Sequence, residues 1–128
     1  MASILKVDEM QGVTSAGDIT ITGEGGSATQ SLQQGLAKCW ARFNGTGTAA
    51  IDDSFNVASL SDNGTGNYTV NYTNSMNNDN YAKADGGGHW SEQSTSDSTG
   101  TASMLTYSSS PALADYTNVT FIVVGDLA

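Results

Sequence analysis

The fold class can be predicted from one stretch of the chain, Ser54-Phe-Asn-Val-Ala-Ser-Leu-Ser-Asp-Asn-Gly-Thr-Gly-Asn-Tyr-Thr-Val-Asn-Tyr72. Two runs with strand periodicity flank Asn63-Gly64, and this dipeptide between such runs is a strong signal for a β-hairpin. In the second run, Tyr68, Val70 and Tyr72 share one face, and polar residues share the other. That alternation predicts a strand with one buried side and one side facing water. We therefore expect an antiparallel hairpin with its turn at this dipeptide.

The rest of the chain repeats the pattern of short strands separated by turn residues. Residues 118–124 are apolar on both faces, which is typical of a strand that lies centrally in a sheet or against another subunit. Ser, Thr, Gly and Asn make up 56 of the 128 residues, a composition that disfavours helix and suits tight turns. Residues 85–101 are the least hydrophobic part and predict an exposed loop or strand pair. The fold expected is all-β: a single antiparallel β-sandwich, jelly-roll-like or immunoglobulin-like, of about seven or eight short strands.

Residues 1–27 are predicted to form an extended N-terminal arm, and residues 28–128 the β-sandwich domain. The arm carries two short strand-like segments and ends in Gly23-Glu-Gly-Gly-Ser27, which is typical of a flexible joint. It has too few large apolar residues to bury a core of its own. We expect those residues to be assembly contacts instead: Ile4, Leu5, Val7, Ile19 and Ile21.

The charge of the chain argues against two classes of partner. The formal net charge is −9, and the four basic residues are scattered along the sequence as Lys6, Lys38, Arg42 and Lys83. Binding to nucleic acid needs clustered Lys and Arg, as does attraction to an anionic membrane surface. No stretch is apolar for the roughly 18 residues of a membrane helix, and the first residues lack the features of a signal peptide. We expect no nucleic acid and no membrane insertion.

The residues that could carry chemistry are few. His89, the only histidine, lies in the Gly-rich stretch Gly86-Gly-Gly-His-Trp90, which is poorly suited to hold a catalytic group in place. We interpret His89 and Trp90 as candidate contacts to a partner or receptor, because aromatic residues are favoured at interfaces. Paired carboxylates for glycoside hydrolysis are compatible with the composition, but no spacing defines such a pair. The chain is therefore interpreted as non-enzymatic, with a small glycan-active enzyme as the least favoured alternative.

The sequence also predicts no metal site and no cofactor. Cys39 is the only cysteine, so a disulfide within the chain is impossible, and a zinc site of ordinary composition lacks ligands. We interpret Cys39 as a small buried side chain. The Asn- and Asp-rich residues 77–80 do not have the spacing of a calcium loop and are better explained as a turn.

One part of the chain resembles a known family. The stretch Gly35-Leu-Ala-Lys-Cys-Trp-Ala-Arg-Phe-Asn-Gly-Thr-Gly-Thr48, followed by residues 53–72 and 76–82, is similar to a module of tail-fibre-like and other virion proteins of marine and freshwater tailed bacteriophages. The opening Ser3-Ile-Leu-Lys-Val-Asp8 also resembles the start of such proteins. The resemblance implies an exposed, trimeric β domain without catalytic residues.

These observations lead to two readings of the function. The first is a trimeric capsid-decoration (cement) protein on the virion surface, assembled in the host cytoplasm, which stabilises the shell through contacts of its arm with the major capsid protein. We favour it because a short module with an apolar arm needs a repeated lattice to bind. The alternative is a short tail-fibre or receptor-binding tip protein that contacts tail components and uses Trp90 and residues 85–101 to bind a host-surface glycan or protein.

Overall fold

The computed structural model describes residues 4–14, 19–88, 90–93, 96–109 and 112–128, with residues 90–93 placed by their backbone. Two compact units divide the chain, Met1–Leu36 and Ala37–Ala128. The boundary predicted after residue 27 differs from this division, because that boundary falls inside a hairpin of the first unit.

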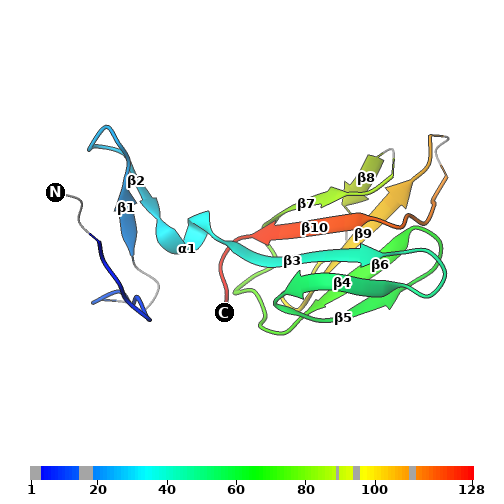
Figure 1. Cartoon of the computed structure of the whole chain (residues 1–128), viewed down its shortest axis with the longest axis horizontal. Helices are drawn as coiled ribbons and strands as arrows, with labels where there is room; N and C mark the ends of the chain where they lie inside the picture. The colour runs from blue at the N-terminus through cyan, green and yellow to red at the C-terminus, as the bar shows by residue number, and fades with distance from the viewer. Residues whose placement is uncertain (1–3, 15–18, 89, 94–95, 110–111) are drawn as a thin grey trace. The chain divides into compact units, whose positions relative to one another are not determined.

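The first unit contains that hairpin and one helical turn (Figure 1). Strand β1 (Thr20–Thr22) pairs antiparallel with β2 (Thr29–Ser31), and helix α1 (Leu32–Gly35) follows directly. The Ser31 hydroxyl accepts a hydrogen bond from the Gln34 N–H at 3.4 Å at the start of the helix. A serine at this position stabilises a helix because it satisfies an amide that has no partner within the helix.

The described residues of the first unit form no apolar core. None of residues 4–14 and 19–36 is buried, and α1 buries no side chain. A single helical turn and an isolated two-stranded hairpin are each marginal in water. Hydrogen bonds and turn chemistry therefore hold these elements without the support of burial.

The second unit is an antiparallel β-sandwich, which confirms the predicted fold class (Figure 1). One four-stranded sheet has the order β4-β3-β10-β7, and the other has the order β5-β6-β9-β8. The strands in the described residues of this unit are β3 (Ala37–Asn44), β4 (Ala50–Phe55), β5 (Val57–Asp62), β6 (Asn67–Tyr72), β7 (Ala82–Gly86), β8 (Trp90–Gln93), β9 (Thr101–Tyr107) and β10 (Val119–Val124).

The core of the second unit follows the alternation of its strands. Strand β10 lies between β3 and β7, as its apolar sequence predicted, and alternates strictly between buried and exposed residues. The rings of Phe43 and Tyr68 meet edge to face with centroids 5.1 Å apart, an arrangement that aromatic pairs favour. The buried apolar residues form one cluster that takes residues from both sheets: Cys39, Ala41, Phe43, Tyr68, Val70, Tyr72, Met76, Ala102, Met104, Val119, Phe121 and Val123.

The β5–β6 hairpin confirms the predicted turn at Asn63 and Gly64. The Asn63 N–H donates to the Asn67 carbonyl and the Asn67 N–H donates to the Gly64 carbonyl, both at 2.9 Å. Gly64 has a φ of 124°, which glycine adopts far more easily than residues with a side chain. Residues 85–101, expected as a loop or an exposed strand pair, include the end of β7 and all of β8, which pairs with β9.

The strand predicted over residues 54–60 is wrong in one respect, because it breaks at Asn56. Strand β4 ends just before this residue and β5 begins just after it, and the two strands belong to different sheets. Asn56 has a φ of 58°, a left-handed conformation that Asn tolerates better than most residues. Its side-chain amide donates to the carbonyls of Lys38 and Asn74 at 2.9 and 3.1 Å, and its Oδ1 accepts from the Asn74 N–H at 2.7 Å. These bonds fix the corner at which the chain passes from one sheet to the other.

Candidate functional site

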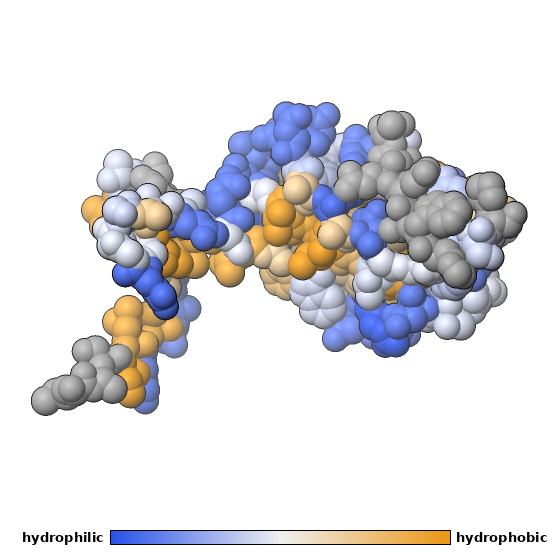
Figure 2. Space-filling model, turned by 90° about the horizontal axis from the view of Figure 1, so that it is seen from above, coloured by the Kyte–Doolittle hydropathy of each residue, from blue (hydrophilic) through white to orange (hydrophobic). Residues whose placement is uncertain are grey.

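The first candidate site is the set of arm residues expected to make assembly contacts. Ile4 and Leu5 are each 79% exposed, and Val7 and Ile21 are about half exposed, while Ile19 is partly exposed. Hydrophobic surface is visible on both units in the space-filling view (Figure 2). Apolar side chains that have no core to enter are available for burial against another molecule.

The second candidate site, His89 and Trp90, stays a prediction. His89 lies outside the described residues. The backbone of Trp90 is the first position of β8, opposite Tyr107 of β9, so this residue lies on a strand at the edge of its sheet.

A third surface was not predicted as such, although its signal lay in the apolar character of residues 118–124. On the outer face of the β4-β3-β10-β7 sheet, Phe55 lies opposite Trp40, Trp40 opposite Ile122, and Ile122 opposite Ala84. Phe55 is 52% exposed, Ile122 is 42% exposed, and Trp40 is half-buried. We call these four residues the apolar row. Cross-strand partners share a face, so the row runs across all four strands.

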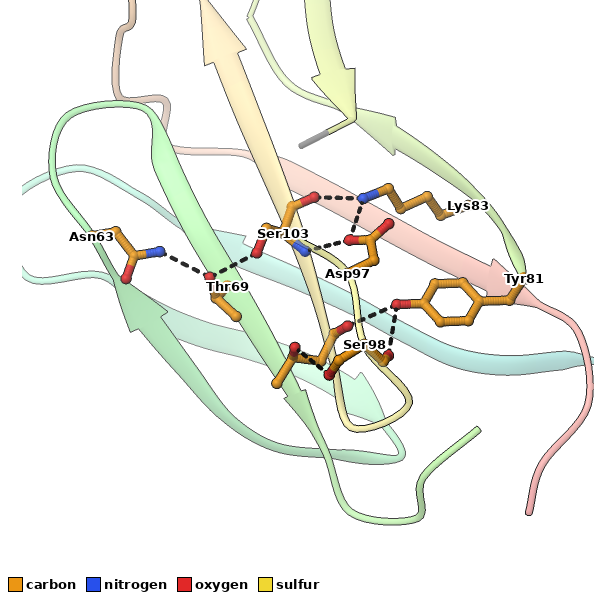
Figure 3. A network of polar contacts seen from close by, with 8 residues as sticks. Asn63, Thr69, Tyr81, Lys83, Asp97, Ser98 and Ser103 are labelled. Carbon is orange, nitrogen blue, oxygen red and sulfur yellow. Dashed lines mark hydrogen bonds and ion pairs between the residues drawn. The ribbon is translucent and has the colours of Figure 1, made fainter. Parts of the chain in front are cut away.

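The fourth candidate site is a buried polar cluster that joins the two sheets (Figure 3). Lys83 on β7 belongs to one sheet, and Ser103 on β9 belongs to the other. The Lys83 Nζ lies 2.7 Å from Oδ1 of Asp97 and donates to the Ser103 carbonyl at 2.6 Å. The same Asp97 Oδ1 accepts from the Ser103 N–H at 3.0 Å. The Lys83 side chain is only 1% exposed, which is rare for lysine unless it is paired.

Asp85 adds a second carboxylate to this cluster. It lies two residues after Lys83 on β7, and its Oδ1 is buried without a hydrogen-bond partner in the described structure. Burial raises the pKa of Asp85 to about 6; the charge of Lys83 opposes that rise and the charge of Asp97 adds to it. Asp85 is therefore close enough to both residues for their charges to act on its carboxyl group.

The loop that carries Asp97 is held by further bonds. The Tyr81 hydroxyl donates to the carbonyls of Ser98 and Thr101, at 3.2 and 2.7 Å (Figure 3). The Ser98 and Thr101 hydroxyls also lie 2.9 Å apart. These contacts place Asp97 beside β9. Sequence reasoning missed the cluster because Lys83, Asp85 and Asp97 have no recognisable spacing.

The remaining groups offer little for catalysis or ligand binding. Burial raises the pKa of the Cys39 thiol to about 12, and the thiol faces the core, as predicted for a small buried side chain. An open hollow of about 200 Å³ lies on the β1–β2 hairpin, below the roughly 300–1,000 Å³ of small-molecule pockets. Within the described residues, no His, Cys, Asp and Glu side chains are grouped in a way that could hold a metal ion. In the same part of the chain, no helix is long and apolar enough to span a membrane.

Comparison with known proteins assigns no role to these candidate sites, so we interpret them from their own residues. No protein-family model, curated protein or solved structure matches this chain.

Proposed function

We propose that this chain is a non-enzymatic structural protein of a bacteriophage virion surface, a trimeric capsid-decoration protein whose first unit binds neighbouring shell proteins. The observation that carries the proposal is the exposed apolar surface of the first unit. Ile4 and Leu5 are almost fully exposed, and no described residue of this unit is buried. A segment of this kind gains stability only when another surface covers it. The resemblance of residues 35–48 and 53–72 to phage virion modules supplies the kind of partner.

The energetics favour a repeated lattice over a single partner. Burying one large aliphatic side chain contributes about 1.5–3 kcal/mol, and ordering of the arm removes part of that gain. The few side chains of one arm therefore bind weakly. Three arms that act together on a symmetric shell gain affinity through their high effective concentration.

The apolar row supports self-association of the sandwich but is too small to act alone. The row has one residue on each of four strands about 4.8 Å apart, and each outward residue takes up about 6.6 Å along its strand, so its footprint is roughly 130 Å². Stable interfaces bury about 800 Å² on each partner. In this proposal the row is one part of the contact between copies, and the arm and the shell provide the rest.

A retention experiment tests the proposal. Shells of the encoding phage that lack this protein are incubated with the full chain, with a variant that lacks residues 1–22, and with the double substitution Ile4→Ser and Leu5→Ser. We expect both variants to be lost from sedimented shells while the melting temperature of the sandwich stays unchanged. The matched control is the double substitution Asp8→Asn and Glu9→Gln, which alters the same segment without removing apolar surface and should be retained. Unchanged occupancy of both arm variants would contradict the proposal.

The alternative, a receptor-binding fibre tip, is favoured by one observation. Trp90 starts an edge strand, where the sheet can accept a partner. Substitution of Trp90→Ala should reduce adsorption of particles to host cells under this alternative and leave adsorption unchanged under the first proposal.

A further inference from the structure

We propose that Lys83 and Asp97 condense into an intramolecular isopeptide bond that links the two sheets covalently. This inference is independent of the virion role, because it rests on the buried cluster of the second unit alone.

The geometry brings the reacting atoms together. The Lys83 Nζ lies 2.7 Å from Asp97 Oδ1, and the carbon to be attacked, Cγ, is bonded to that oxygen. Reacting atoms in near-attack arrangements are roughly 3–3.5 Å apart, and well-oriented intramolecular pairs reach effective molarities of roughly 10⁵–10⁸ M. Both groups are held from several sides. The Ser103 carbonyl accepts from Nζ, and the Ser103 N–H donates to the Asp97 carboxylate.

The surroundings favour the amide over the ion pair. Lys83 is almost fully buried, and Asp97 is 23% exposed. Removing an ammonium and a carboxylate from water carries a large desolvation cost that their mutual attraction only partly offsets. Condensation replaces two charges by one neutral amide and releases a water molecule.

The two groups can exchange the protons between themselves. The Lys83 ammonium passes one proton to Asp97 Oδ1 across their 2.7 Å hydrogen bond, which leaves a neutral amine whose lone pair attacks Cγ of the Asp97 carboxylic acid. The C–N bond forms, a second proton passes from nitrogen to the same oxygen, the C–O bond breaks, and water leaves with the electron pair of that bond. Three ammonium hydrogens thus become one amide N–H and the two hydrogens of water, and no oxidant or other reactant is needed.

The position of the bond gives it a consequence for the fold. Lys83 lies on β7, an edge strand of one sheet, and Asp97 precedes β9 of the other sheet. The link therefore clamps an edge of the sandwich. A chain with a single cysteine has no disulfide for this purpose.

Intact mass spectrometry of the purified full chain tests the proposal. The mass of the chain from its sequence is 13.2 kDa. We expect the purified wild-type chain to be lighter than this by one water molecule. Lys83→Arg keeps the positive charge but should have its full mass. Lys6→Arg, in the first unit, is the matched control and should lose one water as the wild type does. A folded wild-type chain at full sequence mass overturns the proposal.

Trypsin locates the bond and separates it from other dehydrations. The sequence has no Lys or Arg after Lys83, so the unlinked chain yields residues 43–83 and 84–128 as separate peptides. The linked chain should keep residues 43–128 as one fragment, because the acylated Lys83 is no longer a cleavage site. Asp97→Asn should give the same fragment by loss of one ammonia. A water loss that persists in Lys83→Arg would instead report a cyclised aspartate and would overturn the proposal.

Discussion

Both units of this chain contain paired β-strands, but they use their apolar residues in opposite ways. In residues 4–14 and 19–36, aliphatic side chains such as Ile4 and Leu5 remain exposed, and no described residue is buried. In the second unit, residues of the same kind alternate with polar ones on paired strands and close into one core cluster. The difference shows that strand pairing alone gives local structure, whereas stability and a defined interior require a second sheet to cover the first.

The largest expected effect comes from emptying a core position and comparing it with an arm position. Phe43 is fully buried against Tyr68, so Phe43→Ala should lower the free energy of unfolding by about 3–5 kcal/mol. Ile21→Ala in the first unit should change it by less than about 0.5 kcal/mol, because Ile21 has no core to leave. Denaturant unfolding of both variants measures the difference. A comparable loss in Ile21→Ala would show that the first unit is part of the cooperative fold.

The next effect tests the corner that joins the two sheets. Asn56→Ala removes the amide bonds to Lys38 and Asn74 and leaves alanine at a φ of 58°, which it tolerates less well than asparagine does; together these effects should cost about 2–3 kcal/mol. Asn56→Gly relieves the backbone strain and should recover about 1 kcal/mol of that loss. Equal stability of the Ala and Gly variants in thermal unfolding would mean that the side-chain bonds alone hold the corner.

A pair of glycines compares the same local strain in the two units. Gly26 in the first unit and Gly47 between β3 and β4 have φ values of 74° and 70°, and neither has atoms within reach of an added Cβ. Gly47→Ala should cost roughly 1–2 kcal/mol in unfolding of the sandwich, because alanine is strained at this φ. Gly26→Ala should leave that transition unchanged. A shift in both variants would indicate that the two units unfold together.

The smallest effect is a pH dependence that Asp85 of the second unit should give. The folded-state pKa of Asp85, about 6, lies above its unfolded value of about 3.9, so the folded chain binds more protons between pH 4 and 6. The free energy of unfolding should therefore fall as pH rises through this window, by roughly 1 kcal/mol once solvent screening is allowed for.

The control for this pH effect is Asp85→Asn, which should remove the slope that Asp85 contributes. Identical slopes for the two chains between pH 4 and 7 would show that Asp85 is not buried in solution.

Much of the sandwich was predictable because its signals are local. Residues 67–72 alternate clearly, Asn63-Gly64 marks a turn, and residues 118–124 are apolar enough to require a central place. The break at Asn56 was missed because the sequence of residues 54–60 alternates across it. One residue with a left-handed φ turns the chain from one sheet to the other and leaves that sequence pattern uninterrupted. The arm residues stand out in the sequence by their hydrophobicity, but whether they would find a core within the chain depends on contacts that are distant in sequence.

The amino-acid sequence by itself determined the fold class, the hairpin and the central strand, because each depends on periodicity and turn preferences within a few residues. It also determined that no disulfide can form within the chain, since Cys39 is the only cysteine. Only the tertiary structure decided which charged residues meet. Lys83 and Asp97 are 14 residues apart, on β7 of one sheet and in the segment before β9 of the other. Asp85 lies near them because β7 directs Lys83 and Asp85 to the same side. Lysine and aspartate usually lie on the surface, and burial changes their chemistry in ways that the sequence does not reveal, as the raised pKa of Asp85 shows.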